Sequence, residues 1–188
     1  MIYSKKILPK VIIACILMST QCMCSSKNYQ ASNNNKVEIK TNNRELKKFM
    51  EQGFEKQLNT KGVNANDIIK TAHKYLGVPH CMGGTTFKCM DCSGLLYTCF
   101  KTHGINLPHS SEQQARYGKY IADRSLLKRG DLVFFIRTYN TNKYITHSGI
   151  YLGNNEFIHT SSSKGVTINS INNSWWSERF IFGTRIFK

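Results

Sequence analysis

Acidic side chains are scarce in this sequence. Its 188 residues contain 11 Asp and Glu against 26 Lys and Arg, which gives a formal net charge of +15 at pH 7. The basic residues are scattered rather than gathered in blocks, and the chain has neither a groove-reading motif nor an aromatic–basic repeat. We therefore expect no nucleic-acid partner, and a basic surface that faces an anionic polymer or membrane.

Long hydrophobic runs are missing as well. The apolar stretch over residues 11–18 is too short to cross a bilayer as a helix. It follows Lys5, Lys6 and Lys10 and precedes small and polar residues. This pattern predicts a secretory signal peptide over residues 1–24, whose removal leaves the exported part strongly basic.

Cysteines near the end of this signal raise a second interpretation, a lipoprotein whose lipid-bearing Cys becomes the new N-terminus. Cys22 and Cys24 follow the apolar run and are the candidate lipidation sites, although Gln21 and Met23 are poor residues before a cut. Cys15 has the better local motif, but cleavage there would split the run. Ordinary signal cleavage is the alternative.

The rest of the chain divides into three parts, and no internal repeat is visible. Residues 25–42 are rich in Asn and Ser and predict a polar tether. Residues 43–63 predict a helical extension, and residues 64–188 a single folded domain. Apolar residues recur at helical spacing in the extension, at Leu46, Phe49, Met50, Phe54 and Leu58.

Three helices are predicted at the start of the domain. The first is capped by Asn64 or Asn66 and ends at Gly77. Its expected buried face consists of Ile68, Ile69, Ala72, Tyr75 and Leu76, with His73 on the surface. The second runs from Cys92 to about His103, with Asp91 as its N-cap. Its apolar residues Leu95, Leu96, Cys99 and Phe100 predict deep burial.

The third helix is predicted to begin near Ser111, which forms a capping-box pattern with Gln114. From Gly130 onward the pattern becomes strand-like, with short β-branched and aromatic runs. These runs are GDLVFFI, THSGIYLG, EFIHTS, GVTINSI and RFIFGTRIF, with a hairpin turn at Asn154-Asn155 between the second and third. Helices followed by an antiparallel sheet predict an α+β fold.

The stretch KCMDCSG, residues 88–94, carries two cysteines three positions apart. A thioredoxin-like redox pair is disfavoured because helices rather than a strand precede it. Zinc has enough ligands in His80, Cys81, Cys89 and Cys92, but their spacing lacks the two paired knuckles of a ribbon site. A structural disulfide is the plain alternative for any of these cysteines in an exported protein.

Nucleophilic catalysis explains the pattern better. Cys92 at the first turn of a buried helix is expected to feel the positive helix end, which favours its thiolate. Such a thiol needs an imidazole to share its proton and a third group to orient that imidazole. His147 and His159 lie on two consecutive predicted strands, where one can orient the other.

The segments YLGVPHCMGGTTFKCMDCSGLLYTCF, GINLPHSSEQQARYGK, LKRGDLVFF, HSGIYLGNNEFIHTS and GTRIF, taken in order, resemble the NlpC-type cell-wall cysteine peptidases, a papain-like family. The resemblance covers residues 65–188. It implies a helical subdomain that carries the nucleophile Cys92, packed on an antiparallel sheet that carries the base His147 and the orienting His159. It also implies hydrolysis next to γ-D-glutamyl residues in peptidoglycan stem peptides, through a thioester.

Two positions depart from the family pattern. His80 stands where the family usually has a tyrosine that helps to hold the oxyanion, and an imidazole N–H can donate in its place. His109 stands where Arg or Tyr is usual, and with Asp91, Ser93 and Ser110 it forms the candidate substrate-binding set.

We expect a monomer in the bacterial cell envelope, as a periplasmic protein or outer-membrane lipoprotein, with no cofactor and no metal. A wall-binding lipoprotein that no longer cuts, and an amidase or acyl transferase on the same fold, are the alternatives.

Overall fold

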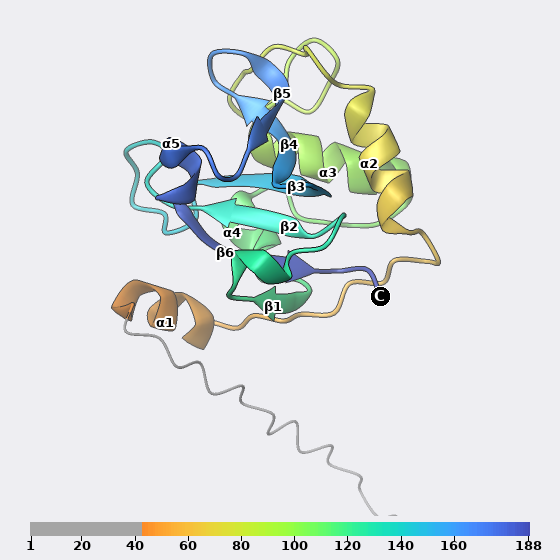
Figure 1. Ribbon diagram of the computed structural model, residues 1–188. Helices are drawn as coiled ribbons and strands as arrows, with labels where there is room; N and C mark the ends of the chain where they lie inside the picture. Colours follow the sequence, from red (N-terminus) through yellow and green to blue (C-terminus); the bar gives the residue numbers. More distant parts are fainter. Residues whose placement is uncertain (1–42) are drawn as a thin grey trace, which may run out of the picture. The chain divides into compact units, whose positions relative to one another are not determined.

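A computed structural model describes residues 43–188 of the chain (Figure 1). The predicted signal peptide, the predicted tether and the candidate lipidation sites Cys22 and Cys24 lie outside the described residues. No helix within the described part is both long and apolar enough to cross a membrane.

A six-stranded sheet, antiparallel at every pairing, forms the centre of the fold, with the strand order β1-β6-β2-β3-β4-β5. The strands are β1 (Lys119–Ile121), β2 (Leu132–Phe135), β3 (His147–Gly153), β4 (Glu156–Ser161), β5 (Gly165–Ser170) and β6 (Phe180–Arg185). The helices are α1 (Arg44–Glu51), α2 (Ala65–His73), α3 (Cys92–Thr102), α4 (Ser111–Gln114) and α5 (Ser174–Ser177), with a 3-10 turn at Arg124–Leu126. The predicted α+β class is confirmed.

The five predicted strand runs are β2 to β6, and the turn between β3 and β4 is as predicted. Asn154 and Asn155 have φ angles of 52° and 62°, the left-handed conformation that a tight hairpin turn requires. The short edge strand β1 was missed, because it lies within a segment that the pattern predicted to be helical. Its partner is β6, more than 60 residues away, and such a pairing leaves no local signal.

Helix α3 packs against β3, β4 and α2, and this packing carries Cys92 to the sheet (Figure 1). Its predicted core residues Leu95, Leu96, Cys99 and Phe100 are all fully buried. Asp91 is its N-cap, as predicted, and Gly104 follows its end with a φ of 70°. The nucleophile candidate therefore begins a helix that the core holds along its length.

Helix α1 is shorter than its apolar spacing suggested. It ends at Glu51, and Gly53 follows with a φ of 100°, so Phe54 and Leu58 lie beyond the helix. Both still pack against the main core. The apolar spacing was correct for burial and wrong for helix length, because the glycine turns the backbone out of the helix.

Helices α2 and α4 show one confirmation and two corrections. Asn64 caps α2 in a capping box with Asp67. Leu76, predicted to be buried, is 44% exposed because it lies past the end of α2, in the turn before Gly77. The capping box predicted for Ser111 and Gln114 is wrong: the N-cap of α4 is the preceding serine, and α4 has no side-chain cap.

Candidate active site

Cys92 begins α3, and the Asp91 carboxylate holds the backbone around it. Oδ1 of Asp91 accepts from the Gly94 N–H at 2.6 Å and from the Ser93 hydroxyl at 2.9 Å. Oδ2 accepts from the Gly83 N–H at 2.7 Å, which ties the preceding loop to the helix start. Asp91 was predicted to bind substrate, but both of its carboxylate oxygens accept hydrogen bonds that hold the backbone around Cys92.

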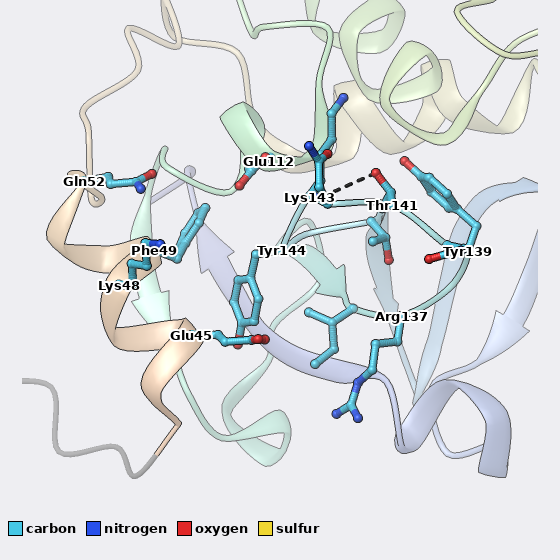
Figure 2. A pocket seen from close by; sticks show the side chains of 14 residues that line it. Glu45, Lys48, Phe49, Gln52, Glu112, Arg137, Tyr139, Thr141, Lys143 and Tyr144 are labelled. Carbon is cyan, nitrogen blue, oxygen red and sulfur yellow. Dashed lines mark hydrogen bonds between the residues drawn. The ribbon is translucent and has the colours of Figure 1, made fainter.

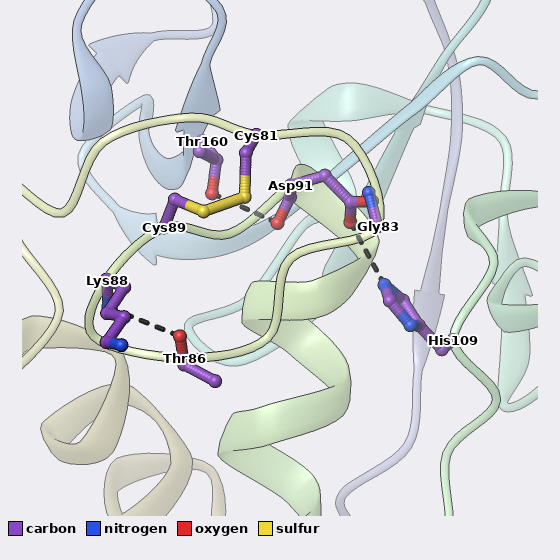
Figure 3. The surroundings of a disulfide bond; sticks show 8 residues. All are labelled: Cys81, Gly83, Thr86, Lys88, Cys89, Asp91, His109 and Thr160. Carbon is purple, nitrogen blue, oxygen red and sulfur yellow. Dashed lines mark hydrogen bonds and ion pairs between the residues drawn. A yellow bond between two sulfur atoms is a disulfide. The ribbon is translucent and has the colours of Figure 1, made fainter.

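His109 joins this cluster from the other side (Figure 3). Its Nε2 lies 3.2 Å from Asp91 Oδ1, and its ring stacks on Tyr97 at 5.4 Å between centroids. Burial alone would raise the pKa of Asp91, but the donors from Gly94, Ser93, Gly83 and His109 together hold it below its ordinary value. Asp91 is therefore a carboxylate at neutral pH.

The two strand histidines are hydrogen-bonded to each other. His147 on β3 places its Nε2 2.9 Å from His159 Nδ1 on β4, and His159 Nε2 lies 2.8 Å from Asn169 Oδ1 on β5. An amide oxygen only accepts, so His159 Nε2 carries a hydrogen and donates to Asn169. Neutral His159 then accepts at Nδ1 from His147 Nε2–H. His147 Nδ1 is left with a lone pair, as a general base requires.

Close packing around the histidines requires a glycine opposite them. A Cβ added to Gly149 would lie 2.7 Å from the Phe157 ring and 3.3 Å from His159 Cβ. Phe157 stacks on the His159 ring at 4.6 Å between centroids, and Trp176 meets His147 and His159 at 5.0 and 4.6 Å. The relay is therefore enclosed by aromatic rings and the backbone.

A second polar chain starts at the thiol. Cys92 Sγ lies 3.5 Å from Ser111 Oγ, which lies 2.9 Å from Ser148 Oγ, and the Ser148 hydroxyl donates to Gln114 Oε1 at 3.1 Å. The Gln114 amide nitrogen donates to the carbonyls of Ser93 and Pro108, which fixes its orientation. Since Ser148 gives its hydrogen to Gln114, the hydrogen between the serines belongs to Ser111. The Ser111 oxygen therefore accepts from the thiol.

Burial opposes charge on both reacting groups. It raises the pKa of the Cys92 thiol, an effect that the nearby Asp91 charge reinforces. Burial, together with His159 and His80, holds the pKa of His147 well below its ordinary value, and burial lowers the pKa of His159 to about 4. Desolvation of the thiol therefore opposes the thiolate that the helix end is expected to favour.

A cavity of about 650 Å³ opens over these residues. Cys92 and His147 both line it, which brings the predicted nucleophile and base to one space. Its walls include the other predicted site residues His80, Asp91, Ser93, His109 and Ser110, together with Asn169. His159 lies behind His147, fully buried.

Cys81 and Cys89 form a disulfide in the loop before α3 (Figure 3). Cys89 is therefore not paired with Cys92, which is a free cysteine, as is Cys99. Because Cys89 is bonded to Cys81, it is available neither for a redox pair with Cys92 nor as a zinc ligand. No group of three potential metal ligands occurs among residues 43–188.

Sequence reasoning missed Ser111 as a thiol contact, Asn169, Gly149 and Trp176. Ser111 was noticed, but as a helix cap. His159 is paired with Thr167 on β5, and Asn169 lies two residues farther along, opposite Phe157. Residues two apart on a strand share a face, so Asn169 lies on the same face of β5 as Thr167. Asn169 could have been identified from the sequence if the pairing of β4 with β5 had been assumed. No local sequence pattern pointed to Trp176.

The NlpC/P60 family profile matches residues 77–185, more than half of the chain. Murein DD-endopeptidase MepS/Murein LD-carboxypeptidase of Escherichia coli K12 is 42% identical over 111 residues, which are 58% of this chain and 56% of that protein. Gamma-DL-glutamyl hydrolase of Bacillus subtilis 168 is 41% identical over 114 residues, 60% of this chain and 27% of that protein.

A solved NlpC/P60 family protein from Bacillus cereus ATCC 10987 superposes with a TM-score of 0.60 at 31% identity, over 67% of this chain and 41% of that chain. The matched region is thus less than two thirds of the length of each of these relatives. Sequence, fold and the position of the matched segment agree: the chain belongs to the NlpC/P60 family, and it has the α+β, papain-like fold of that family.

Proposed function

We propose that this protein is a cysteine endopeptidase that hydrolyses peptidoglycan stem peptides, with Cys92 as nucleophile, His147 as general base and His159 as the orienting residue. The observation that carries the proposal is the relay from Asn169 through His159 to His147. With this relay, His147 Nε2 carries the hydrogen and His147 Nδ1 keeps a lone pair that can accept a proton. His147 lines the same cavity as the Cys92 thiol.

The reaction follows from these positions. When substrate binds, the thiol turns from Ser111 toward His147, whose Nδ1 takes the thiol proton as sulfur attacks the carbonyl carbon. The imidazolium then gives this proton to the leaving amine, and a thioester remains. Water, deprotonated by the same nitrogen, hydrolyses the thioester and regenerates the thiol.

Charge on the substrate oxygen needs donors in the same cavity. The N-terminal end of α3 offers a positive potential at Cys92, and His80 lines the cavity beside it. We assign the oxyanion-donating role to the His80 ring N–H. Ser93, Ser110 and His109, on the cavity wall, are assigned to substrate binding, and the Asp91 carboxylate acts through His109 and the helix start.

The bond that we propose is the γ-D-glutamyl bond to the diamino acid. The name of the B. subtilis relative refers to a γ-glutamyl bond, whereas that of the E. coli relative refers to DD and LD bonds. Purified protein would be incubated with defined muropeptides, and the products analysed by mass spectrometry. Fragments cut between glutamate and the diamino acid support the proposal, whereas cuts only at D-alanine bonds contradict this bond assignment. No cut by wild type, with binding retained, favours a wall-binding protein.

We further propose that the protein is exported to the cell envelope and anchored by lipid at Cys22 or Cys24. The charged start and short apolar run support export. Metabolic labelling with a fatty acid, in single and double Cys→Ser variants of these two positions, tests the anchor. Label that persists in the double variant contradicts it.

A further inference from the structure

A second cavity of about 810 Å³ lies between α1 and the loop over residues 137–144 (Figure 2). Glu45 and Lys48 line it from α1, and Gln52 from just past the end of that helix. The loop faces them with Tyr139, Thr141 and Lys143. The family match begins at residue 77, so α1 lies outside it. One wall of this cavity is therefore built by a segment that the family profile does not cover.

This α1 cavity continues the catalytic cavity. Four residues line both spaces, namely Glu112, Tyr139, Lys143 and Thr146. A peptide that extends from the thiol past Tyr139 would therefore enter the α1 cavity.

The α1 wall is rigidly attached to the domain. The Arg116 guanidinium donates to the backbone carbonyls of Phe49 and Gly53 and to Gln52 Oε1. It also lies over the Phe49 ring at 4.2 Å, and that ring packs against Phe182 of β6 at 6.0 Å between centroids. A wall that is already in place costs little ordering free energy when a ligand binds.

The loop wall is fixed at its base. Thr146 Oγ accepts from both the backbone N–H and the hydroxyl of Thr138, at 3.0 and 2.8 Å. Tyr144 packs against Phe49 at 5.9 Å between centroids, which joins the loop to α1. Both walls are therefore attached to the fold and to each other by contacts of their own residues, through Thr138–Thr146 and Phe49–Tyr144.

Charge on the lining indicates the kind of occupant. Three cations, Lys48, Arg137 and Lys143, line the cavity with two acids, Glu45 and Glu112. The three cations are solvent-exposed, so they are available to ligand carboxylates. A γ-linked glutamyl residue uses its side-chain carboxyl in the peptide bond and keeps its α-carboxylate free. A cross-linked stem peptide therefore brings carboxylates to these three cations, together with amide groups for Gln52.

We propose that the α1 cavity binds a second acidic stem peptide, the one cross-linked to the peptide being cut. This inference rests on the proposed function, and it makes the protein selective for cross-linked over monomeric muropeptide. The selectivity comes from Lys48 and Arg137, which line only the α1 cavity.

The test compares kcat/KM for a cross-linked muropeptide dimer and for the corresponding monomer. In a Lys48→Glu/Arg137→Glu variant we expect the dimer-to-monomer ratio to fall on the order of ten-fold, mainly through KM for the dimer. Lys47→Glu is the matched control, because Lys47 is an exposed lysine of α1 that does not line the cavity. Raising the salt concentration should lower the wild-type ratio by screening the same charges.

An equal ratio in the wild type, the control and the double variant would overturn the inference while leaving the proposed function intact. Dimer and monomer affinities are also measured by calorimetry with the Cys92→Ala protein, which tests the second site even if no bond is cut. Equal affinity for the two ligands there, unaffected by the charge reversals, contradicts the second site independently of catalysis.

Discussion

His147 Nε2 and His159 Nδ1 lie 2.9 Å apart, on neighbouring strands and in a diagonal rather than a directly opposed register. The diagonal lets one ring meet the edge of the other, with an angle of 75° between their planes. This arrangement directs Nδ1 of His147 away from the relay. The two rings therefore have different chemical roles although they are the same residue type.

Replacement of His147 by Ala should lower kcat by about a hundred-fold or more, since no base remains to take the thiol proton. His159→Gln should lose less, because an amide can still accept from His147 Nε2–H. Both are measured as kcat on a defined muropeptide, with folding checked by circular dichroism. Equal and total inactivation would instead give His159 a direct part in proton transfer.

Asn169 should matter through the tautomer of His159. Asn169→Leu removes the acceptor for His159 Nε2–H, and we expect kcat to fall by roughly ten-fold with KM nearly unchanged. Asn169→Asp keeps an acceptor and adds a negative charge, which raises the pKa of His159 and of His147. The acid limb of the kcat profile should therefore move to higher pH in the Asp variant. An unmoved limb together with full activity in the Leu variant would contradict this positioning role.

Local patterns were sufficient for most elements of the fold. Asp91 before an apolar helix predicted the α3 cap, and the alternating runs predicted β2 to β6. Elements that depend on distant partners were not visible, such as β1, which pairs with β6. The end of α1 was misjudged because one backbone angle at Gly53 outweighs an apolar pattern.

The identities of the site residues were easier to predict from the sequence than their pKa values. Cys92, His147 and His159 were named from a helix start and two strands, and the structure brings the first two to one cavity. The raised pKa of the Cys92 thiol could not be predicted, because it depends on desolvation, which is a tertiary property. Ser111 illustrates the same limit: its side chain turns toward Cys92 and Ser148 rather than capping α4.

Cys92→Ala should abolish cleavage without unfolding the protein, because a first-turn side chain at a cavity wall contributes little packing. Cys99→Ala is the matched control, since the second free cysteine lies in the core of the same helix. It should lower stability and leave kcat per folded molecule unchanged. Cys89→Ala breaks the disulfide with Cys81 and should leave most activity. An active Cys92→Ala protein with an inactive Cys89→Ala protein would reverse the assignment.

Stability should fall as the pH drops from about 6.5 to about 4. In this window His159 is protonated in the unfolded chain, whereas its folded pKa of about 4 keeps it neutral in the native state. The unfolded state then binds more protons, so acid favours unfolding, by up to about 3 kcal/mol for this residue. The lowered pKa of His147 also makes the native state less stable as the pH falls. The lowered pKa of Asp91 affects stability only below this pH window.

Urea unfolding at a series of pH values measures this slope. His159→Gln should flatten it, whereas His73→Gln, at an exposed position on α2, should not. A slope that persists unchanged in the His159 variant would mean that other groups cause the acid sensitivity.

His80 provides the sharpest test of how the oxyanion is held. If its ring N–H donates to the developing charge, His80→Ala should lower kcat with little change in KM, because the interaction forms only in the transition state. Loss of one such donor costs on the order of 3 kcal/mol. His80→Tyr restores a phenol O–H donor and should therefore keep activity. The competing explanation is that His80 only packs the loop whose disulfide lies next to it. His80→Ala would then lower stability alone, and an unchanged kcat per titrated active site would end the oxyanion role.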